Sequence, residues 1–127
     1  MSRVVEIRRT TRAPLARVAF ERIARAILGA RYQLSLVVCG DALATRMNIK
    51  HRGKKYSPNV LSFPLSKSDG EIFLNLRVAA REAKQFDVSV NERITLLFAH
   101  GCLHLKGMKH GTKIEATEKR IVQKFAR

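Results

Sequence analysis

The sequence predicts an α/β or α+β layer fold, in which strands and helices pack in layers around one hydrophobic core. Two observations support this prediction. Four short β-rich runs alternate with segments of helical periodicity along the 127 residues. The chain shows no internal repeat, low-complexity tract or linker, and its length suits one hydrophobic core. We therefore expect residues 1–127 to form a single domain rather than a helical bundle.

The first half of the chain is expected to contain two strands and two helices. Proline suits the first turn of a helix, glycine ends one, and aspartate is a common N-cap, so these residues mark the helix ends. In order, the elements are a strand at Val4–Ile7, a helix from Pro14 to Leu28 that Gly29 ends, a strand at Leu34–Cys39, and a helix that Asp41 caps and that extends towards Ile49.

The second half is expected to contain two more strands and three helices. The third strand is flanked by Pro58 and Pro64, and these prolines favour an edge strand because proline cannot donate to a sheet ladder. The elements are strands at Asn59–Phe63 and Glu71–Asn75, a helix at Arg77–Phe86, a long apolar helix capped by Ser89 or Asn91, and a last helix from about Thr112 to Phe125.

Three of the four histidines lie within eleven residues at a spacing typical of a metal site. His100 and His104 are four residues apart in the apolar helix, so their rings project side by side. Gly107 then allows the chain to leave the helix, and His110 can return to the same point. A lone HxxxH pair is weak evidence, since histidines on apolar helices are often core residues. The third histidine favours a Zn²⁺ site whose fourth position stays open for water.

The residues around these histidines argue against a peptidase and against a thiol ligand. Zinc peptidases with an H-E-x-x-H motif carry a glutamate base after the first histidine, where this chain has Gly101. A metallopeptidase is therefore only a third hypothesis. Cys102 faces away from the imidazoles, and Cys39 ends an apolar run, so we expect both thiols in the core. Unpaired cysteines are compatible with a reducing cytoplasm.

The charge of the chain predicts a polyanionic partner. Lys and Arg number 25 against 10 Asp and Glu, which gives a formal net charge of +15 and a pI near 11. Such an excess on a small domain is typical of nucleic-acid-binding proteins. No apolar run is long enough to span a membrane, and the N-terminus lacks the apolar region of a signal peptide. We therefore expect no membrane partner and a cytoplasmic location.

Four ordered motifs together resemble the YbeY family of bacterial rRNA-maturation endoribonucleases. They are Asn48–Lys54, Asn59–Pro64 (N-V-L-S-F-P), Gly70–Ile72 and His100–His110. The resemblance implies a small mixed sheet, here of four strands packed with about five helices, and a cleft with one Zn²⁺ per chain held by His100, His104 and His110. It also implies processing and quality control of ribosomal RNA.

The chain departs from the family pattern at three positions. Lys109 stands where an Asp usually precedes the third histidine, Met108 replaces an aromatic residue, and Lys55 replaces an acid after the R-G-K segment. The loss of the Asp removes a candidate hydrogen-bond acceptor for a zinc-bound imidazole. We therefore expect these departures to affect the metal affinity and the rate rather than the geometry of the metal site.

Arg52 is the second residue that the resemblance singles out. Zinc held by three imidazoles can lower the pKa of its water to ~7 or polarise a phosphate. A guanidinium can bind phosphate oxygens in a bidentate manner and stabilise the charge of the transition state. Without the resemblance, Arg52 would be interpreted as an ordinary solvated cation. The family resemblance favours a catalytic role instead. The sequence offers no obvious general base, and His110 and Glu71 are the candidates.

A basic segment leads into the third strand. Ala42–Ser68 contains no acid, and Lys54 and Lys55 lie beside Tyr56, which can stack on a base. A charge run is commonly only a solvated surface. The strand that follows borders the metal cleft in the family, so we interpret the segment as an RNA-entry surface. The expected substrate-binding residues are Arg52, Lys54, Lys55, Asn59 and Ser62.

The leading hypothesis is a single-strand-specific, metal-dependent endoribonuclease of rRNA maturation and ribosome quality control that acts near the 3′ end of small-subunit rRNA. The alternative is a ribosome-associated RNA-binding assembly factor with little or no nuclease activity. Expected partners are ribosomal RNA, the small ribosomal subunit and ribosome-assembly proteins, and no DNA is expected.

Overall fold

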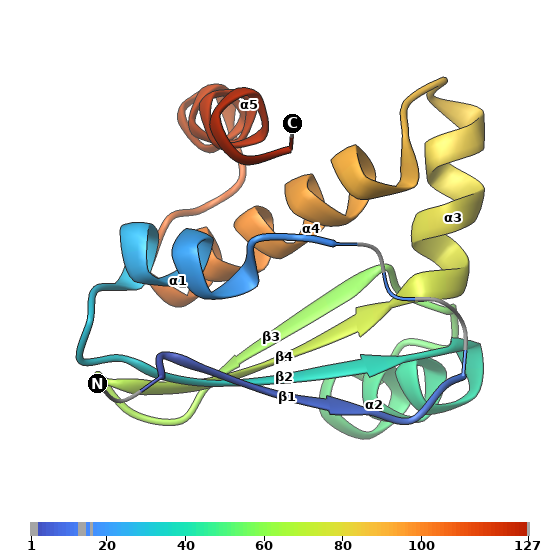
Figure 1. Cartoon of the computed structure of the whole chain (residues 1–127). Coiled ribbons are helices and arrows are strands. Elements are labelled where there is room, and N and C mark those ends of the chain that lie inside the picture. The colour runs from blue at the N-terminus through green and yellow to red at the C-terminus, as the bar shows by residue number, and fades with distance from the viewer. Residues whose placement is uncertain (1–2, 13–14, 16, 127) are drawn as a thin grey trace.

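The computed structural model describes residues 3–12, 15 and 17–126. A four-stranded sheet separates α2 on one face from α1 and α4 on the other, and α5 lies beyond α4 (Figure 1). The elements are β1 (Val5–Arg9), α1 (Phe20–Leu28), β2 (Gln33–Cys39), α2 (Asp41–Arg52), β3 (Val60–Pro64), β4 (Asp69–Asn75), α3 (Leu76–Gln85), α4 (Val90–Leu105) and α5 (Thr112–Phe125).

The sheet is mixed and has the strand order β1-β2-β4-β3. β1 pairs with β2 and β2 pairs with β4 in parallel, whereas β3 pairs with β4 in an antiparallel manner. The strand flanked by prolines thus lies at an edge, as its sequence predicts. The mixed four-stranded sheet and the five helices of the described residues confirm the expected fold class.

The core has two parts because alternate strand residues face opposite sides of the sheet. The larger part lies between the sheet and α1 and α4, and it includes Cys102. The smaller part lies between the sheet and α2, and it includes Cys39. Both cysteines are buried, as expected, and burial raises the pKa of the Cys39 thiol to about 11. No helix in the described part of the chain combines the length and apolar character needed to cross a membrane.

The structure corrects two helix starts. The first helix begins at Phe20 rather than Pro14, which lies outside the described residues. Residues 17–19, directly before Phe20, are not helical. Asp41 is not the cap of α2, because Gly40 holds that position and no side chain caps it. The Asp41 carboxylate instead accepts hydrogen bonds from Ser57, Asn75 and Arg81.

Candidate metal centre and cleft

Helix α4 places His100 and His104 on one face. Ser89, one of the two expected caps, begins the helix by accepting a hydrogen bond from the Glu92 N–H at 3.0 Å. The opposite face is apolar and packs on the sheet, which leaves the two histidines half-buried at the surface of the core. Their Nε2 atoms lie 2.8 Å apart, so the two rings converge as the four-residue spacing predicts.

The turn after α4 brings the third histidine back to this point. Gly107 has a φ of 103°, and its N–H donates to His104 O while the Met108 N–H donates to Leu103 O. This pair of bonds is a Schellman C-cap, which requires the left-handed backbone that glycine favours. The His110 ring then lies 4.6 Å from the His104 ring and 5.1 Å from the His100 ring, between centroids.

The three histidines together fit a metal ion. One ring nitrogen of each lies within 4.8 Å of those of the others, which is close enough for one ion to contact all three. Burial lowers the pKa of His104, and the rings of His100 and His110 lower it further. This favours the neutral imidazole, the form that binds metals. A set of three imidazoles suits Zn²⁺ and leaves a coordination position for water.

Sequence reasoning missed Glu118, a buried carboxylate on α5 that contacts this cluster. Its Oε1 atom lies against Nδ1 of His100. A carboxylate there holds the proton on Nδ1 and leaves the Nε2 lone pair for a metal. The signal was available in the periodicity of the last helix, since Glu118 is four residues after the buried Ile114 and shares its face. Glu118 supplies an acceptor of the kind that Lys109 cannot provide.

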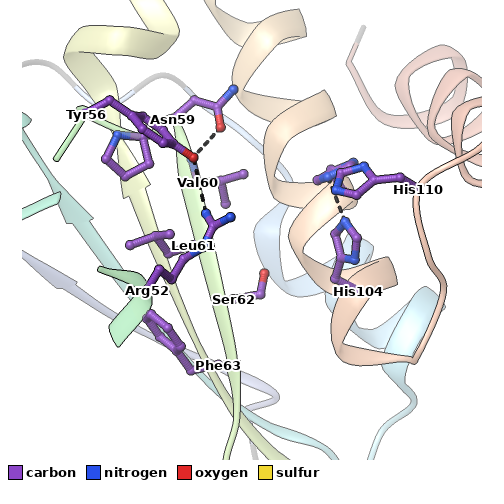
Figure 2. A pocket seen from close by; sticks show the side chains of 11 residues that line it. Arg52, Tyr56, Asn59, Val60, Leu61, Ser62, Phe63, His104 and His110 are labelled. Atoms are coloured by element: carbon purple, nitrogen blue, oxygen red, sulfur yellow. Dashed lines mark hydrogen bonds between the residues drawn. The ribbon is translucent and has the colours of Figure 1, made fainter. Parts of the chain in front are cut away.

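Arg52 and Tyr56 lie across the cleft from His104 and His110 (Figure 2). Arg52 is the last residue of α2, and its Nη1 donates to the Tyr56 hydroxyl at 3.4 Å. The loop between them is fixed to the core, because the buried Asn48 amide donates to the Tyr56 carbonyl at 3.0 Å. The conformation of the loop therefore depends on a residue of the core.

Strand β3 lies between these two walls. The Ser62 hydroxyl donates to the Gly101 carbonyl of α4 at 3.1 Å. A Cβ atom at Gly101 would lie 3.0 Å from both Ser62 Oγ and Ile72 Cδ1, so the close packing of α4 on the sheet favours glycine there. The position that carries the glutamate base of zinc peptidases thus faces the sheet in this chain. This is a further argument against the metallopeptidase hypothesis.

Asn59 precedes β3 and anchors it to the helical layer. Its amide nitrogen donates to both carboxylate oxygens of Glu82 at 3.2 Å, and its Oδ1 accepts from the Val60 N–H at 2.7 Å. Glu82 also forms a salt bridge with Arg93 at 2.9 Å. The Asn59 side chain is therefore already engaged by groups of the protein.

A cleft of about 480 Å³ brings most of the expected site residues together. Its lining consists of Arg52, Tyr56, Pro58, Asn59–Phe63, His100, His104 and His110. Lys54 and Lys55 are exposed on the loop after α2 and are not among the lining residues. Glu71, considered above as a base, is not among them either, and its carboxylate pairs with Arg8 at 3.5 Å.

The structure is thus an α+β protein in which three histidines, two on helix α4 and one on the segment after it, face an arginine across the edge of a sheet. The family model "Endoribonuclease YbeY" matches residues 3–126. The chain belongs to the YbeY family.

Curated relatives agree with this assignment, and a solved structure has the same fold. The chain is 31% identical to the endoribonuclease YbeY of Geobacter sulfurreducens, over 91% of this chain and 86% of that protein. It is 38% identical to that of a Chelativorans species, over 67% of this chain and 58% of that protein. The solution structure of a Thermotoga maritima protein superposes with a TM-score of 0.64 at 19% identity, over 93% of this chain and 87% of that one, and shows the same fold.

Proposed function

We propose that this chain is a zinc-dependent endoribonuclease that cleaves single-stranded RNA. The observation that carries the proposal is the position of Arg52 opposite a three-histidine cluster in one cleft. Histidines supply the metal ligands, and the guanidinium supplies a planar donor for a phosphate between the two walls. Membership of a family of endoribonucleases supports the same reaction.

The contacts of the residues support a role for each of them. His100, His104 and His110 would hold one Zn²⁺, which would supply a water of lowered pKa and a Lewis acid for phosphate oxygen. Glu118 orients the His100 ring. Arg52, steadied by Tyr56, binds the oxygens of the scissile phosphate and stabilises the charge that develops on them. His110 is the most exposed of the three proposed ligands.

The surface around the cleft suits an RNA strand. The chain carries a net charge of +15. Lys54 and Lys55, on the exposed loop after Arg52, provide phosphate contacts outside the cleft. Asn59 and Ser62 line the cleft itself. We propose that residues 1–127 act as one domain in the cytoplasm. The proposed substrate is the ribosomal RNA of the small subunit, cleaved near the 3′ end of that RNA. The cleavage would serve rRNA maturation and ribosome quality control, and ribosome-assembly proteins are proposed partners.

The alternative is an RNA-binding assembly factor with little nuclease activity. Its support is the chemistry next to His110, where Lys109 replaces an acid and no carboxylate lines the cleft among the described residues. Without a carboxylate in the cleft to take up a proton, the attacking water or RNA 2′-hydroxyl would depend on the metal to lower its pKa.

One experiment separates the two. Purified protein is assayed for metal content and for cleavage of a single-stranded RNA, beside the His104→Ala variant. The proposal expects about one zinc per wild-type chain, a strong loss of zinc in the variant, and cleavage only by the wild type. Bound RNA without metal-dependent cleavage in either protein would favour the assembly factor.

A further inference from the structure

The free edge of β3 lines the cleft. Within the described residues, β3 pairs only with β4, and five consecutive residues, Asn59–Phe63, contribute to the lining. Alternate residues of a strand face opposite sides of a sheet, so a pocket on one face would be lined by every second residue. A lining of consecutive residues means that the cleft follows the edge itself, where main-chain groups are presented.

The strand register determines which main-chain groups point into the cleft. The Asn75 N–H donates to Asn59 O, and the Leu65 N–H donates to Asp69 O, both at 2.9 Å. Hydrogen-bonded and non-hydrogen-bonded pairs alternate along an antiparallel ladder. The intervening residues Leu61 and Phe63 therefore bond to β4, and the N–H and C=O groups of Val60 and Ser62 point to the free edge.

Two features of the sequence leave a short row of available groups. The Val60 N–H is already bonded to Asn59 Oδ1, and Pro64 has no N–H to offer. The row consists of the Val60 carbonyl, the Ser62 N–H and the Ser62 carbonyl. Among the described residues, no hydrogen bond from another element of the fold reaches any of these three groups.

This row suits a nucleobase better than a phosphate. Phosphate oxygens only accept hydrogen bonds, so a phosphate at this edge would meet one donor and two carbonyl oxygens that repel it. A base carries donors and acceptors side by side. Figure 2 shows Ser62 between Arg52 and the histidines, so a base at Ser62 would lie beside the phosphate that those residues hold.

We infer that the N–H and C=O of Ser62 form a two-point hydrogen bond with the Watson–Crick edge of one unpaired nucleobase. The inference rests on the proposed function. Each of the four RNA bases has a donor next to an acceptor on that edge, and in a duplex both are already used. The contact therefore selects unpaired RNA and carries little sequence preference.

An extended peptide is the rival occupant of a free strand edge, because it could add a strand to the sheet. Such pairing uses the main-chain groups of successive alternate residues. Here the Val60 N–H is occupied and Pro64 lacks one, so Ser62 alone could pair fully. The net charge of +15 also favours RNA.

The test is a double-mutant cycle between the protein main chain and the RNA base. In a Ser62→Ala background, the residue at 62 is replaced by the corresponding α-hydroxy acid, which converts the amide into an ester and removes only the N–H. Binding of the zinc-loaded proteins is measured for a short single-stranded RNA and for the same RNA with one abasic ribose placed at each position in turn. Gel analysis confirms that the RNA is intact after each measurement.

The amide protein should bind about tenfold more weakly when the base at one position is removed, the effect of one or two lost hydrogen bonds. The ester protein should bind the intact RNA more weakly by a similar factor and should lose little more at that abasic position. Equal losses in both proteins at every position would overturn the inference, since the N–H would then contact phosphate or sugar, or no RNA at all.

Ser62→Pro provides a second variant, which removes the same N–H with a standard amino acid. Proline is tolerated at an edge strand where the N–H points outward, so this protein should retain its circular dichroism spectrum and behave like the ester. The base contact and the proposed nuclease function can fail independently in these experiments. Wild-type cleavage without coupling in the cycle would overturn only the base contact, whereas coupling without cleavage would overturn only the nuclease assignment.

Discussion

The carboxylate of Glu118 lies against Nδ1 of His100, although the two residues are 18 positions apart and belong to different helices. This contact joins α5 to the metal cluster on α4. It makes the last helix a part of the site, because the orientation of one metal-binding ring depends on it.

Replacing Glu118 with glutamine should weaken zinc binding by roughly 10–100-fold, as is typical when the partner of a metal-bound histidine is lost. Glutamine keeps the shape of the side chain but removes the charge that favours the proton on Nδ1. Competition with a chromogenic chelator measures the affinity. Glu115→Gln, on an exposed position of the same helix, is the matched control and should leave it unchanged. Equal affinities for all three proteins would contradict the role of Glu118.

Arg52→Ala should slow RNA cleavage by roughly 10²–10³-fold, as for the loss of one transition-state donor. Zinc content should not change, because arginine is not a ligand. Arg52→Lys should restore only part of the rate, since an ammonium cannot reproduce the planar guanidinium. Single-turnover cleavage measures the effect, and Lys50→Ala, an exposed cation on the same helix, is the control. Equal rates for wild type and Arg52→Ala would exclude the catalytic role.

Reversing the charges of Lys54 and Lys55 to glutamate should weaken RNA binding and leave zinc content unchanged. Both side chains are exposed and lie outside the cleft lining, so their contribution should be electrostatic. A plot of log affinity against log salt should have a slope of about −0.7 per neutralised phosphate for single strands, and the double variant should give a flatter line. Salt-independent binding by the wild type would show that the basic loop has another purpose.

The stability of the fold at acid pH should depend on Asp41. Hydrogen bonds from Arg81, Ser57 and Asn75 hold the pKa of its carboxyl well below its usual range. Because the folded-state pKa is lower than the unfolded value of about 3.9, the ionised group stabilises the fold above that value. This contribution declines as the pH falls below the unfolded value, and it is lost only as the pH passes the lower pKa of the folded state. Urea unfolding at pH 6 and pH 3 should show a difference between wild type and Asp41→Asn that is largest at pH 6 and reduced, though still present, at pH 3. A difference that does not shrink would be the contrary result.

Local patterns in the sequence predict much of this molecule. The four β-rich runs, the prolines around β3 and the spacing of the three histidines each act within a few residues, and the structure confirms the strands, the edge position and the cluster. The start of α1 and the partners of Asp41 depend instead on how distant segments pack. The contact of Glu118 with His100 has the same origin, since it requires the packing of α5 on α4.

The available main-chain groups at Val60 and Ser62 are another feature that local sequence patterns do not predict. The residue types of β3 indicate an edge strand, but only the register with β4 decides whether odd or even residues point outward. A shift of one position would turn the Leu61 N–H towards the cleft instead. Residue types alone do not contain that information.

The contact of α4 with the sheet at Gly101 also bears on how this scaffold can change its chemistry. A Cβ atom there would lie 3.0 Å from Ser62 Oγ and Ile72 Cδ1, so a peptidase-type glutamate at Gly101 would require these side chains to shift. Ser62 is also hydrogen-bonded to the Gly101 carbonyl of the helix that carries His100 and His104. A change towards peptidase chemistry at this position would therefore disturb the contact that holds the metal-binding helix on the sheet.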